Sequence, residues 1–393
     1  MVQVFIGGSN FTSHRMEINH AVGNFFTMKQ LIFTIFALFA TVSLYAQTII
    51  GTVYDAQTRE TIPFCTIVLG SNSTNGTIAN VNGDYIANNI QNIDSIAFSA
   101  VGYERKAFSA AQLMQDATVM LKPRVYQIDE VVVRPINIDT LMQNIKGKIL
   151  ASCPNRYPVL GGMYRKQIVE EGKLSFLGEC EMYCCSKIVK GVSQERVATQ
   201  NVMLTKNTAV FGRFLFPHVS NCAKFYGAYR EILRQSNNWK LNEITSSEDG
   251  QSPVYVLCAT DTYNQTITIH YHVNDNAILW MELVWKGDAL KPFKKSITGA
   301  KLYRNPWKLY FKYSKNAHGK YVLKYSRVEM DMTLDRNKGK LINCVYIMDY
   351  LVTNDNVTGI VPDRKPNYDP FEKAKGKVVE QSELRVIPPD YEL

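Results

Sequence analysis

Short runs of β-type sequence dominate this chain and limit what it can fold into. From residue 48 onwards, apolar and polar residues alternate, or apolar residues run together, over stretches of strand length. Gly, Asn, Asp and Pro separate these stretches, as they do in sheets joined by turns. Tyr (22 residues) and Phe (18) are numerous, and both favour strands. The chain is therefore expected to be mainly β.

The first runs are short and closely spaced, which predicts a small β-sandwich. The predicted strands are 48–54, 63–69, 85–87, 95–100 and 117–121. The turn signals between them lie at 55–60, 71–76 and 81–84.

The same segment carries an ordered series of short motifs. They are Gly51-Thr-Val-Tyr-Asp55, Pro63, Gly76-Thr-Ile-Ala-Asn80, Asn82-Gly83-Asp84-Tyr85 and Phe98-Ser-Ala-Val-Gly102-Tyr103. With this series, residues 48–123 resemble the carboxypeptidase regulatory-like domain. The resemblance implies a transthyretin-like sandwich of seven strands, found in exported Bacteroidota proteins that include TonB-dependent nutrient receptors.

The motif residues have structural roles rather than catalytic ones. Gly76 and Gly83 are expected to allow turns with positive φ, and Gly102 is expected to shape a bend before Tyr103. The family is named for a module attached to zinc carboxypeptidases, whose catalytic domain needs a paired His and Glu and a second His. The sequence shows no such set, so the resemblance brings no activity with it.

A short apolar strand after the domain is a candidate docking strand. It begins after Ile128 and consists of Asp129, Glu130, Val131, Val132 and Val133. In the nutrient receptors a similar run leads into a plug and a barrel, but only 260 residues follow Val133 here. That is too few for a plug and about 22 strands of roughly ten residues each. The strand could instead pair with a partner by edge addition.

The start of the chain has the features of an exported protein. Lys29 precedes an apolar run over 31–44, and Ala46 followed by Gln47 is an acceptable cleavage point. We interpret residues 28–46 as a signal peptide and residues 1–27 as the product of an upstream start. Gln47 stands where a bacterial lipoprotein would need Cys. Because Leu44 occupies a position that prefers a small residue, an uncleaved anchor remains the alternative.

The remainder predicts a connecting helix and then a second β domain. Residues 124–158 are a linker strand and a helix, in which Asp139 is the expected N-cap and Cys153-Pro154 the end. This stretch resembles a segment of Bacteroidota envelope proteins of unknown function. The strands predicted after it are 173–184, 254–258, 266–273, 277–285, 301–302, 307–313, 321–331 and 341–351.

These strands form the expected β-rich domain over 159–355. Asn274-Asp275-Asn276 predicts a hairpin turn between two of them. So long a meander predicts a mostly antiparallel curved sheet or partial barrel, loosely like the periplasmic lipoprotein-carrier fold. Residues 356–393 form a charged tail with several prolines, expected to be extended or poorly ordered.

Two histidines are weak candidates for metal ligands. His270 and His272 are two positions apart on a predicted strand and so share one face with Thr266 and Thr268. Two histidines on one face can chelate a metal, but no third ligand is evident nearby. A polar sheet face explains the same residues, and no cofactor is expected.

The cysteines and aromatic residues each leave two interpretations open. The eight cysteines are 65, 153, 180, 184, 185, 222, 258 and 344, and their spacing shows no compact disulfide framework. Buried thiols are favoured over one or two disulfides. The group Tyr303, Trp307, Tyr310, Phe311 and Tyr313 is expected to be core, although it could stack sugars or line an apolar groove.

The sequence favours a binding or structural protein over an enzyme. It contains no Gly-x-Ser-x-Gly, no Ser-x-x-Lys in a suitable setting and no phosphate loop. The net charge is +9, but basic and acidic residues are interspersed, so nucleic acid is not expected as a partner. We predict a non-enzymatic cell-envelope binding or scaffold protein, in the periplasm or peripherally associated with the outer membrane.

The ligand is expected to be another envelope protein or an apolar or glycan molecule. The first alternative is an accessory component of TonB-linked or other outer-membrane transport or assembly, suggested by the 129–133 strand. The second is an undetected hydrolase, suggested because regulatory-like domains also occur in peptidases.

Overall fold

The protein is described by a computed structural model. The described residues are 48–70, 76–124, 136–153, 158–189, 192–207, 209, 239–247, 252–260, 265–286, 292–297, 300–336, 340–366 and 369–371. Over these ranges the chain is mainly β, as predicted, and no helix has the length and apolar character needed to cross a membrane.

The first part is a two-sheet sandwich of seven described strands. Its sheets have the orders β4-β1-β7 and β3-β2-β5-β6, and β1 runs parallel to β7. The strands are β1 (Ile49–Asp55), β2 (Thr66–Leu69), β3 (Gly76–Ile78), β4 (Asp84–Ala87), β5 (Ile96–Ser99), β6 (Lys106–Phe108) and β7 (Thr118–Leu121). A short helix, α2 (Ala110–Gln115), precedes β7. The predicted sandwich is therefore confirmed, while β3, β6 and α2 were not predicted.

Alternating residues fill the space between the two sheets. Val53, Tyr85 and Val119 point inward from one sheet, and Ile67 and Phe98 from the other. The buried Tyr85 hydroxyl donates to the carbonyl of Ala117 (2.9 Å). This satisfies the polar tip of a side chain that otherwise contributes apolar surface to the core.

The three motif glycines do not all act as predicted. Gly83 (φ +81°) and Gly102 (φ +85°) occupy the left-handed region, which confirms the turn and the bend. The prediction for Gly76 was wrong, because Gly76 begins β3 without a positive φ. A Cβ on Gly76 would collide with the carbonyl oxygen of Ile67, so glycine is needed there to let two backbones approach closely.

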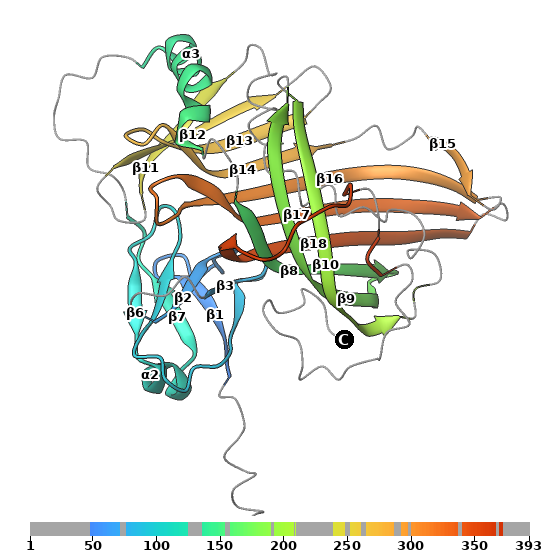
Figure 1. Ribbon diagram of the computed structural model, residues 1–393, viewed down its shortest axis with the longest axis horizontal. Helices are drawn as coiled ribbons and strands as arrows, with labels where there is room; N and C mark the ends of the chain where they lie inside the picture. The colour runs from blue at the N-terminus through green and yellow to red at the C-terminus, as the bar shows by residue number, and fades with distance from the viewer. Residues whose placement is uncertain are drawn as a thin grey trace, which may run out of the picture. The chain divides into compact units, whose positions relative to one another are not determined.

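The second part is one large antiparallel sheet. The order of its described strands is β10-β9-β8-β18-β17-β16-β14-β13-β12-β11, with β15 added on β16. They are β8 (Val159–Glu170), β9 (Lys173–Val189), β10 (Val192–Asn207), β11 (Lys240–Ser246), β12 (Pro253–Thr260), β13 (Gln265–His272), β14 (Ala277–Trp285), β15 (Pro292–Ile297), β16 (Ala300–Lys315), β17 (Tyr321–Arg336) and β18 (Lys340–Val357). The path does not close, so the structure is a curved open sheet (Figure 1).

The turn between β13 and β14 is placed as predicted. Residues 273–276 form it, and Asn276 has a positive φ of 50°, which Asn tolerates better than most residues. The strands themselves are longer than predicted. The two short runs 301–302 and 307–313 belong to the single strand β16, which continues through a register shift between Arg304 and Trp307.

One face of the large sheet is apolar and packs against helix α3 (Ile138–Lys148). Met142 and Ile145 of the helix join Tyr164, Tyr350 and many other buried side chains in one cluster. The predicted N-cap was wrong by two residues. The side chain of Asn137 accepts from the backbone N–H of Thr140 (2.9 Å), which makes Asn137 the cap and puts Asp139 in the first turn.

Part of the charged tail also packs on this apolar face. Phe371 is buried and its ring stacks near Tyr164, with ring centres 6.0 Å apart. The Lys166 ammonium forms a buried ion pair with Asp369 (2.8 Å). A Cβ on Gly178 would lie 2.8 Å from the Phe371 ring, so this glycine leaves the space that the ring occupies. Earlier in the tail, Arg364 forms an isolated antiparallel β-bridge with Val197 on β10.

Candidate functional site

The other face of the large sheet carries a row of charged side chains. Successive strands place Glu179, Arg165, Asp349, Arg327, Tyr310 and Glu282 directly opposite one another, from β9 to β14. Arg165 pairs with Glu179 (2.6 Å), and Arg327 pairs with Asp349 (3.1 Å). The row therefore alternates in sign over four strands, which suits cross-strand pairing.

These charges are buried rather than exposed to solvent. The side chains of Arg327 and Asp349 are each 1% exposed. Asp349 also accepts from the Tyr325 hydroxyl (2.6 Å), and Arg327 also donates to Glu329 (2.8 Å). Buried charges need this degree of pairing, because each partner left alone in a low-dielectric interior costs several kcal/mol.

Phe64 of the sandwich covers the adjoining part of this face. Its ring centre lies 5.2 Å from Tyr310, 5.4 Å from Trp280 and 5.7 Å from Tyr325. The Arg327 guanidinium lies 5.9 Å from the same ring. Phe64 is thus the aromatic anchor by which the sandwich contacts the sheet.

The backbone at Phe64 is in a conformation that bulky residues rarely adopt. Its φ is +57°, in the left-handed region. Its N–H donates to the carbonyl of Asn80 (3.3 Å), and its carbonyl accepts from the Lys312 ammonium (3.3 Å). Contacts on both sides therefore hold Phe64 in a strained conformation, which aims its ring at the sheet.

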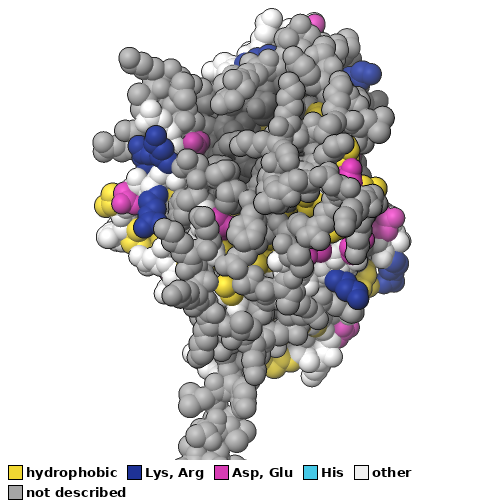
Figure 2. Space-filling model, turned by 90° about the vertical axis from the view of Figure 1, so that its right-hand side faces the viewer, with side chains coloured by type: hydrophobic (Ala, Val, Ile, Leu, Met, Phe, Trp, Pro, Cys, Tyr) yellow, Lys and Arg dark blue, Asp and Glu magenta, His cyan; other side chains and the backbone are white. Residues whose placement is uncertain are grey.

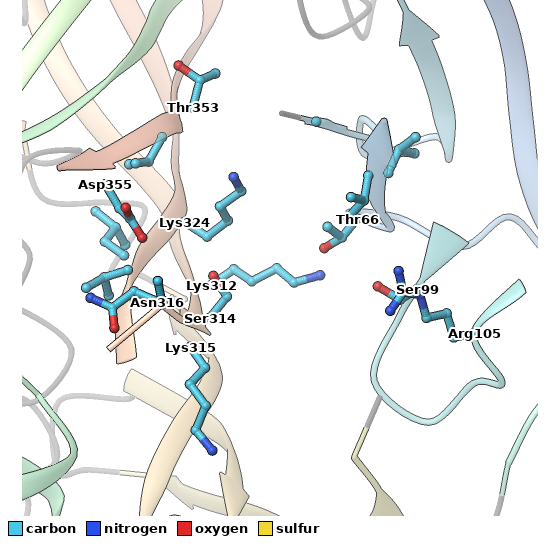
Figure 3. A pocket seen from close by; sticks show the side chains of 17 residues that line it. Thr66, Ser99, Arg105, Lys312, Ser314, Lys315, Asn316, Lys324, Thr353 and Asp355 are labelled. Atoms are coloured by element: carbon cyan, nitrogen blue, oxygen red, sulfur yellow. The ribbon is translucent and has the colours of Figure 1, made fainter. Parts of the chain in front are cut away.

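Lys312 on β16 is the centre of the junction between sandwich and sheet. It lines three cavities where the sandwich meets the sheet, and Figure 3 shows the one lined by Thr66 and Lys324. Of these three, another one has a volume of about 390 Å³ and is lined by Phe64, Tyr103, His270, Trp280 and Tyr310 among others. We name it the aromatic cleft. Its walls come from both the sandwich and the sheet, and it combines ring faces with polar groups, as ligand pockets do.

The two candidate histidines line different cavities. His270 lies opposite Trp280 on β14 and lines the aromatic cleft. Burial, with a smaller effect of Lys312, lowers the pKa of His270 to about 4, so the ring is neutral at pH 7. His272 lines the neighbouring cavity and accepts from the backbone N–H of Asp275 through Nδ1 (3.1 Å).

The described residues do not gather a metal site. No group of three or more His, Cys, Asp or Glu side chains in these ranges could hold an ion. The pairing of β13 with β14 has a register shift between His270 and Tyr271. His270 pairs with Trp280 before the shift, and His272 pairs with Ala277 after it. Seven cysteines lie in the described ranges and form no disulfide bond there, and Cys222 lies outside these ranges.

The predicted aromatic group is divided between the two faces of the sheet. Trp307, Phe311 and Tyr313 pack in or against the apolar core, whereas Tyr310 faces the sandwich. The candidate docking strand, 129–133, lies outside the described residues.

Sequence reasoning missed the residues that build the junction. Phe64, Trp280, Lys312 and Arg327 carried no motif, and each reads as an ordinary strand or turn residue. A signal was present in β17, where the charged residues Arg327, Glu329 and Asp331 alternate with apolar residues. Such alternation is typical of a solvent-facing polar side. It gives no indication that another part of the chain covers that side.

Surface charge on the visible face is dispersed. Figure 2 shows the Lys and Arg side chains of the described residues scattered among Asp and Glu, without a single basic patch on this side.

Comparison with known families identifies the sandwich. The family model of the CarboxypepD_reg-like domain matches residues 49–133. The chain contains a carboxypeptidase regulatory-like domain. The match extends past β7 to the end of the candidate docking strand, and it covers less than a quarter of the chain. Phe64 and the left-handed glycines Gly83 and Gly102 all lie within the regulatory-like domain. No curated protein matches the sequence significantly.

Solved structures resemble the chain only weakly. A LolA superfamily protein from Nitrosomonas europaea has 11% identity, and the match covers 53% of this chain and 93% of that chain with a TM-score of 0.19. MucB has 12% identity, and the match covers 55% of this chain and 94% of that chain with a TM-score of 0.19. The Pseudomonas aeruginosa MucA/MucB complex has 9% identity, and the match covers 53% of this chain and 93% of that chain with a TM-score of 0.20. TM-scores this low carry no argument about the ligand or partner of this chain.

Proposed function

We propose that this chain is a non-enzymatic cell-envelope binding protein whose ligand occupies the aromatic cleft. The observation that carries this proposal is the composition of the cleft wall. Trp280 and Tyr310 present aromatic rings, while His270, Glu282 and Lys312 supply polar groups beside them. The regulatory-like domain closes the cleft through Phe64, so the two parts of the fold form one site.

A glycan is the ligand class that fits this wall. The C–H face of a sugar ring is apolar and packs on aromatic rings, while its hydroxyl groups need donors and acceptors around them. Trp280 and Tyr310 lie 5.7 Å apart between ring centres at an angle of 40°, and so form an angled platform. Neutral His270 can donate or accept a hydrogen bond there.

A glycan array probed with the purified full chain tests this function. Trp280→Ala should abolish the signal of any glycan that binds. The matched control is Trp285→Ala, since Trp285 is on the same strand but contacts Trp307 instead of Phe64 (6.4 Å between ring centres). An unchanged signal in the Trp280 variant, or an array without any binder, would contradict the proposal.

Location in the envelope rests on the leader. Lys29, the apolar run over 31–44 and Ala46 form a signal peptide with cleavage before Gln47. Expression of the whole chain in a Gram-negative host should give a mature protein that begins at Gln47. Mass spectrometry of the exported fraction would measure this, and an intact Met1 in that fraction would overturn it.

A second candidate function is that of an accessory component in outer-membrane transport or assembly. The family match continues to residue 133 and so includes residues 129–133, the predicted docking strand. Such a strand can add to the sheet edge of a partner. Deletion of residues 128–133, followed by pull-down from envelope extracts, should lose partners that the whole chain captures. Unchanged partners would exclude the docking role.

A further inference from the structure

The tail of the chain fills a slot on the apolar face of the large sheet. Phe371 is buried there, with its ring centre 6.0 Å from that of Tyr164 and 5.7 Å from that of Phe176. Asp369, two residues earlier, pairs with Lys166 (2.8 Å). We name this place the tail slot. Its walls in the described part of the chain are Tyr164 and Lys166 of β8 and Phe176 and Gly178 of β9.

Lys166 is a charged residue among apolar ones. Its neighbours on the same face of β8 are Tyr164 and Ile168, Met348 lies opposite on β18, and all three belong to the core cluster. The side chains of Lys166 and Asp369 are 1% and 3% exposed. A buried ion pair is often no more stabilising than apolar residues of the same volume, whereas loss of one partner is strongly destabilising. Lys166 therefore restricts what can fill the slot to a segment that brings a carboxylate.

The segment Asp369-Pro370-Phe371 has a conformation that matches this slot. One carboxylate oxygen of Asp369 accepts from the Lys166 ammonium, and the other accepts from the backbone N–H of Phe371 (3.0 Å). Pro370, between them, has a restricted φ. The carboxylate and the ring thus keep one relative position, which reduces the conformational entropy lost when the segment binds.

The tail also adds to the edge of the sheet. β10 is at one end of the described strand order, and Val197 of β10 exchanges two backbone hydrogen bonds with Arg364 (2.9 and 3.1 Å). Extended peptides add to sheet edges in this way. Most of the chain from 358 to 365 is exposed, Val361 to 82%, and Gly359 has a φ of +80° with open space around the position of a Cβ. The tail is therefore held at separate points, as a bound peptide is.

We propose that the tail slot and the edge of β10 recognise an extended segment of a partner protein, in which a carboxylate precedes an aromatic residue by two positions. Charge complementarity with Lys166 carries this assignment, because a neutral or basic segment would leave the buried ammonium without a counter-charge. Backbone pairing at Val197 supplies affinity that does not depend on sequence. The chain's own tail is the resident occupant, and it lowers the apparent affinity for the partner by the fraction of time that it fills the slot.

This site is independent of the proposed glycan function. The tail slot belongs to the apolar face of the sheet, whereas Trp280 and Tyr310 of the aromatic cleft pack with Phe64 on the other face. Peptide binding is measured without glycan, so its failure would leave the glycan proposal standing, and the reverse also holds.

Fluorescence anisotropy with a labelled synthetic peptide of residues 362–373 tests the proposal. The receptor is the purified full chain with Phe371→Ala, in which the chain's own ring no longer fills the slot. The peptide should bind this receptor with a Kd below about 1 mM, and at least about tenfold more tightly than it binds the original chain, whose tail competes. It should also raise the thermal unfolding temperature of the receptor, because it binds the folded state.

A second receptor guards against poor folding of the first. Asp369→Asn keeps the ring of Phe371 and the volume of the side chain but removes the charge that pairs with Lys166. The peptide should also bind this variant more tightly than the original chain. Circular dichroism shows whether each receptor is folded.

Variants of both partners show whether the tail slot is responsible. Asp369→Ala and Phe371→Ala in the peptide should each weaken binding at least about tenfold, and so should Lys166→Met added to the receptor. The matched control is Lys173→Met added to the receptor, because Lys173 is an exposed lysine at the start of β9. This control should leave binding unchanged.

Three results would overturn the proposal. The first is absence of binding by both receptors, and the second is equal binding of the original and the altered peptides. The third is a dimer of the original chain, detected by light scattering, that Phe371→Ala abolishes. In that case the tail of a second copy, rather than a different protein, would fill the slot.

Discussion

Arg327 and Asp349 lie opposite each other on β17 and β18, with Nη1 3.1 Å from Oδ1 and both side chains 1% exposed. The Arg327 guanidinium lies 5.9 Å from the ring centre of Phe64, which belongs to the regulatory-like domain. The polar face of the sheet is therefore an internal surface at this point. Its charges contribute to joining the two parts of the chain.

The first prediction concerns this ion pair. Arg327→Met and Asp349→Leu should each reduce the free energy of unfolding by about 3–5 kcal/mol, because each removes the opposite charge that faces a buried charge across the two strands. The double variant should be less destabilised than the sum of the two single variants. Urea unfolding measures all three. Strict additivity would show that the pair is not coupled.

A partly exposed ion pair on the same sheet provides the control. Lys308 and Glu329 are 3.8 Å apart, and the side chain of Lys308 is 45% exposed. Lys308→Met should change the free energy of unfolding by less than about 1 kcal/mol, because solvent screens the interaction.

The second prediction concerns the strained anchor. Phe64→Ala should lower the free energy of unfolding by about 3–5 kcal/mol, since it removes a ring that is packed among three others. Phe64→Gly removes the same ring but relieves the left-handed backbone, which costs an L-residue about 1–2 kcal/mol. The Gly variant should therefore be at least as stable as the Ala variant, by thermal or urea unfolding. The opposite order would mean that the backbone strain is absent.

The third prediction concerns pH. The pKa of His270 is about 4 in the folded protein and near 6.5 in the unfolded chain, so the unfolded state binds more protons between these values. Stability should be complete above about pH 7 and should fall by up to about 3 kcal/mol as the pH is lowered to 4. His270→Gln should remove this contribution, as measured by urea unfolding at a series of pH values.

The control for pH is His318→Gln, since His318 is exposed in the turn between β16 and β17. This variant should keep the loss of stability on acidification. If the His270 variant kept it as well, the loss would have another source.

The fourth prediction concerns the tail. Phe371→Ala should lower the free energy of unfolding by about 3–5 kcal/mol, because it removes a buried ring. Gly178→Ala should lower it by about 1–3 kcal/mol, because the new methyl group would enter the space of that ring. Together the two changes should cost less than their sum, since the new methyl then fills part of the cavity. Calorimetric unfolding would show this. A double variant as unstable as the sum would place the two residues out of contact.

The mainly β fold could be predicted because the relevant signals are local. The apolar run over 277–285 gave β14 with its bounds correct, and the Asn274-Asp275-Asn276 turn identified its hairpin. The motif glycines Gly83 and Gly102 identified two bends through their backbone freedom alone. Local signals of this kind do not depend on what the rest of the chain does.

The candidate site could not be predicted because it depends on which side of the sheet the sandwich covers. Alternating charge in Arg327 and Glu329 is the same whether that side faces water or Phe64. Likewise, Asp369 and Phe371 lie among prolines and charged residues, which are typical of a solvent-exposed segment. In the structure, however, Asp369 pairs with Lys166 and the Phe371 ring packs beside Gly178. Such contacts join residues far apart in the chain, and they cannot be deduced from a single sequence.

The pairing of β8 with β18 determines how this protein can assemble. Gln167 of β8 lies opposite Ile347 of β18, so the middle of the large sheet joins the two ends of that part of the chain. β8 to β10 and β11 to β17 can each form hairpins early, but the two groups cannot merge until the last strand is available. Until then both groups present an unpaired strand edge and an open apolar face. The period before residues 340–357 are in place is therefore when the chain is most exposed to aggregation.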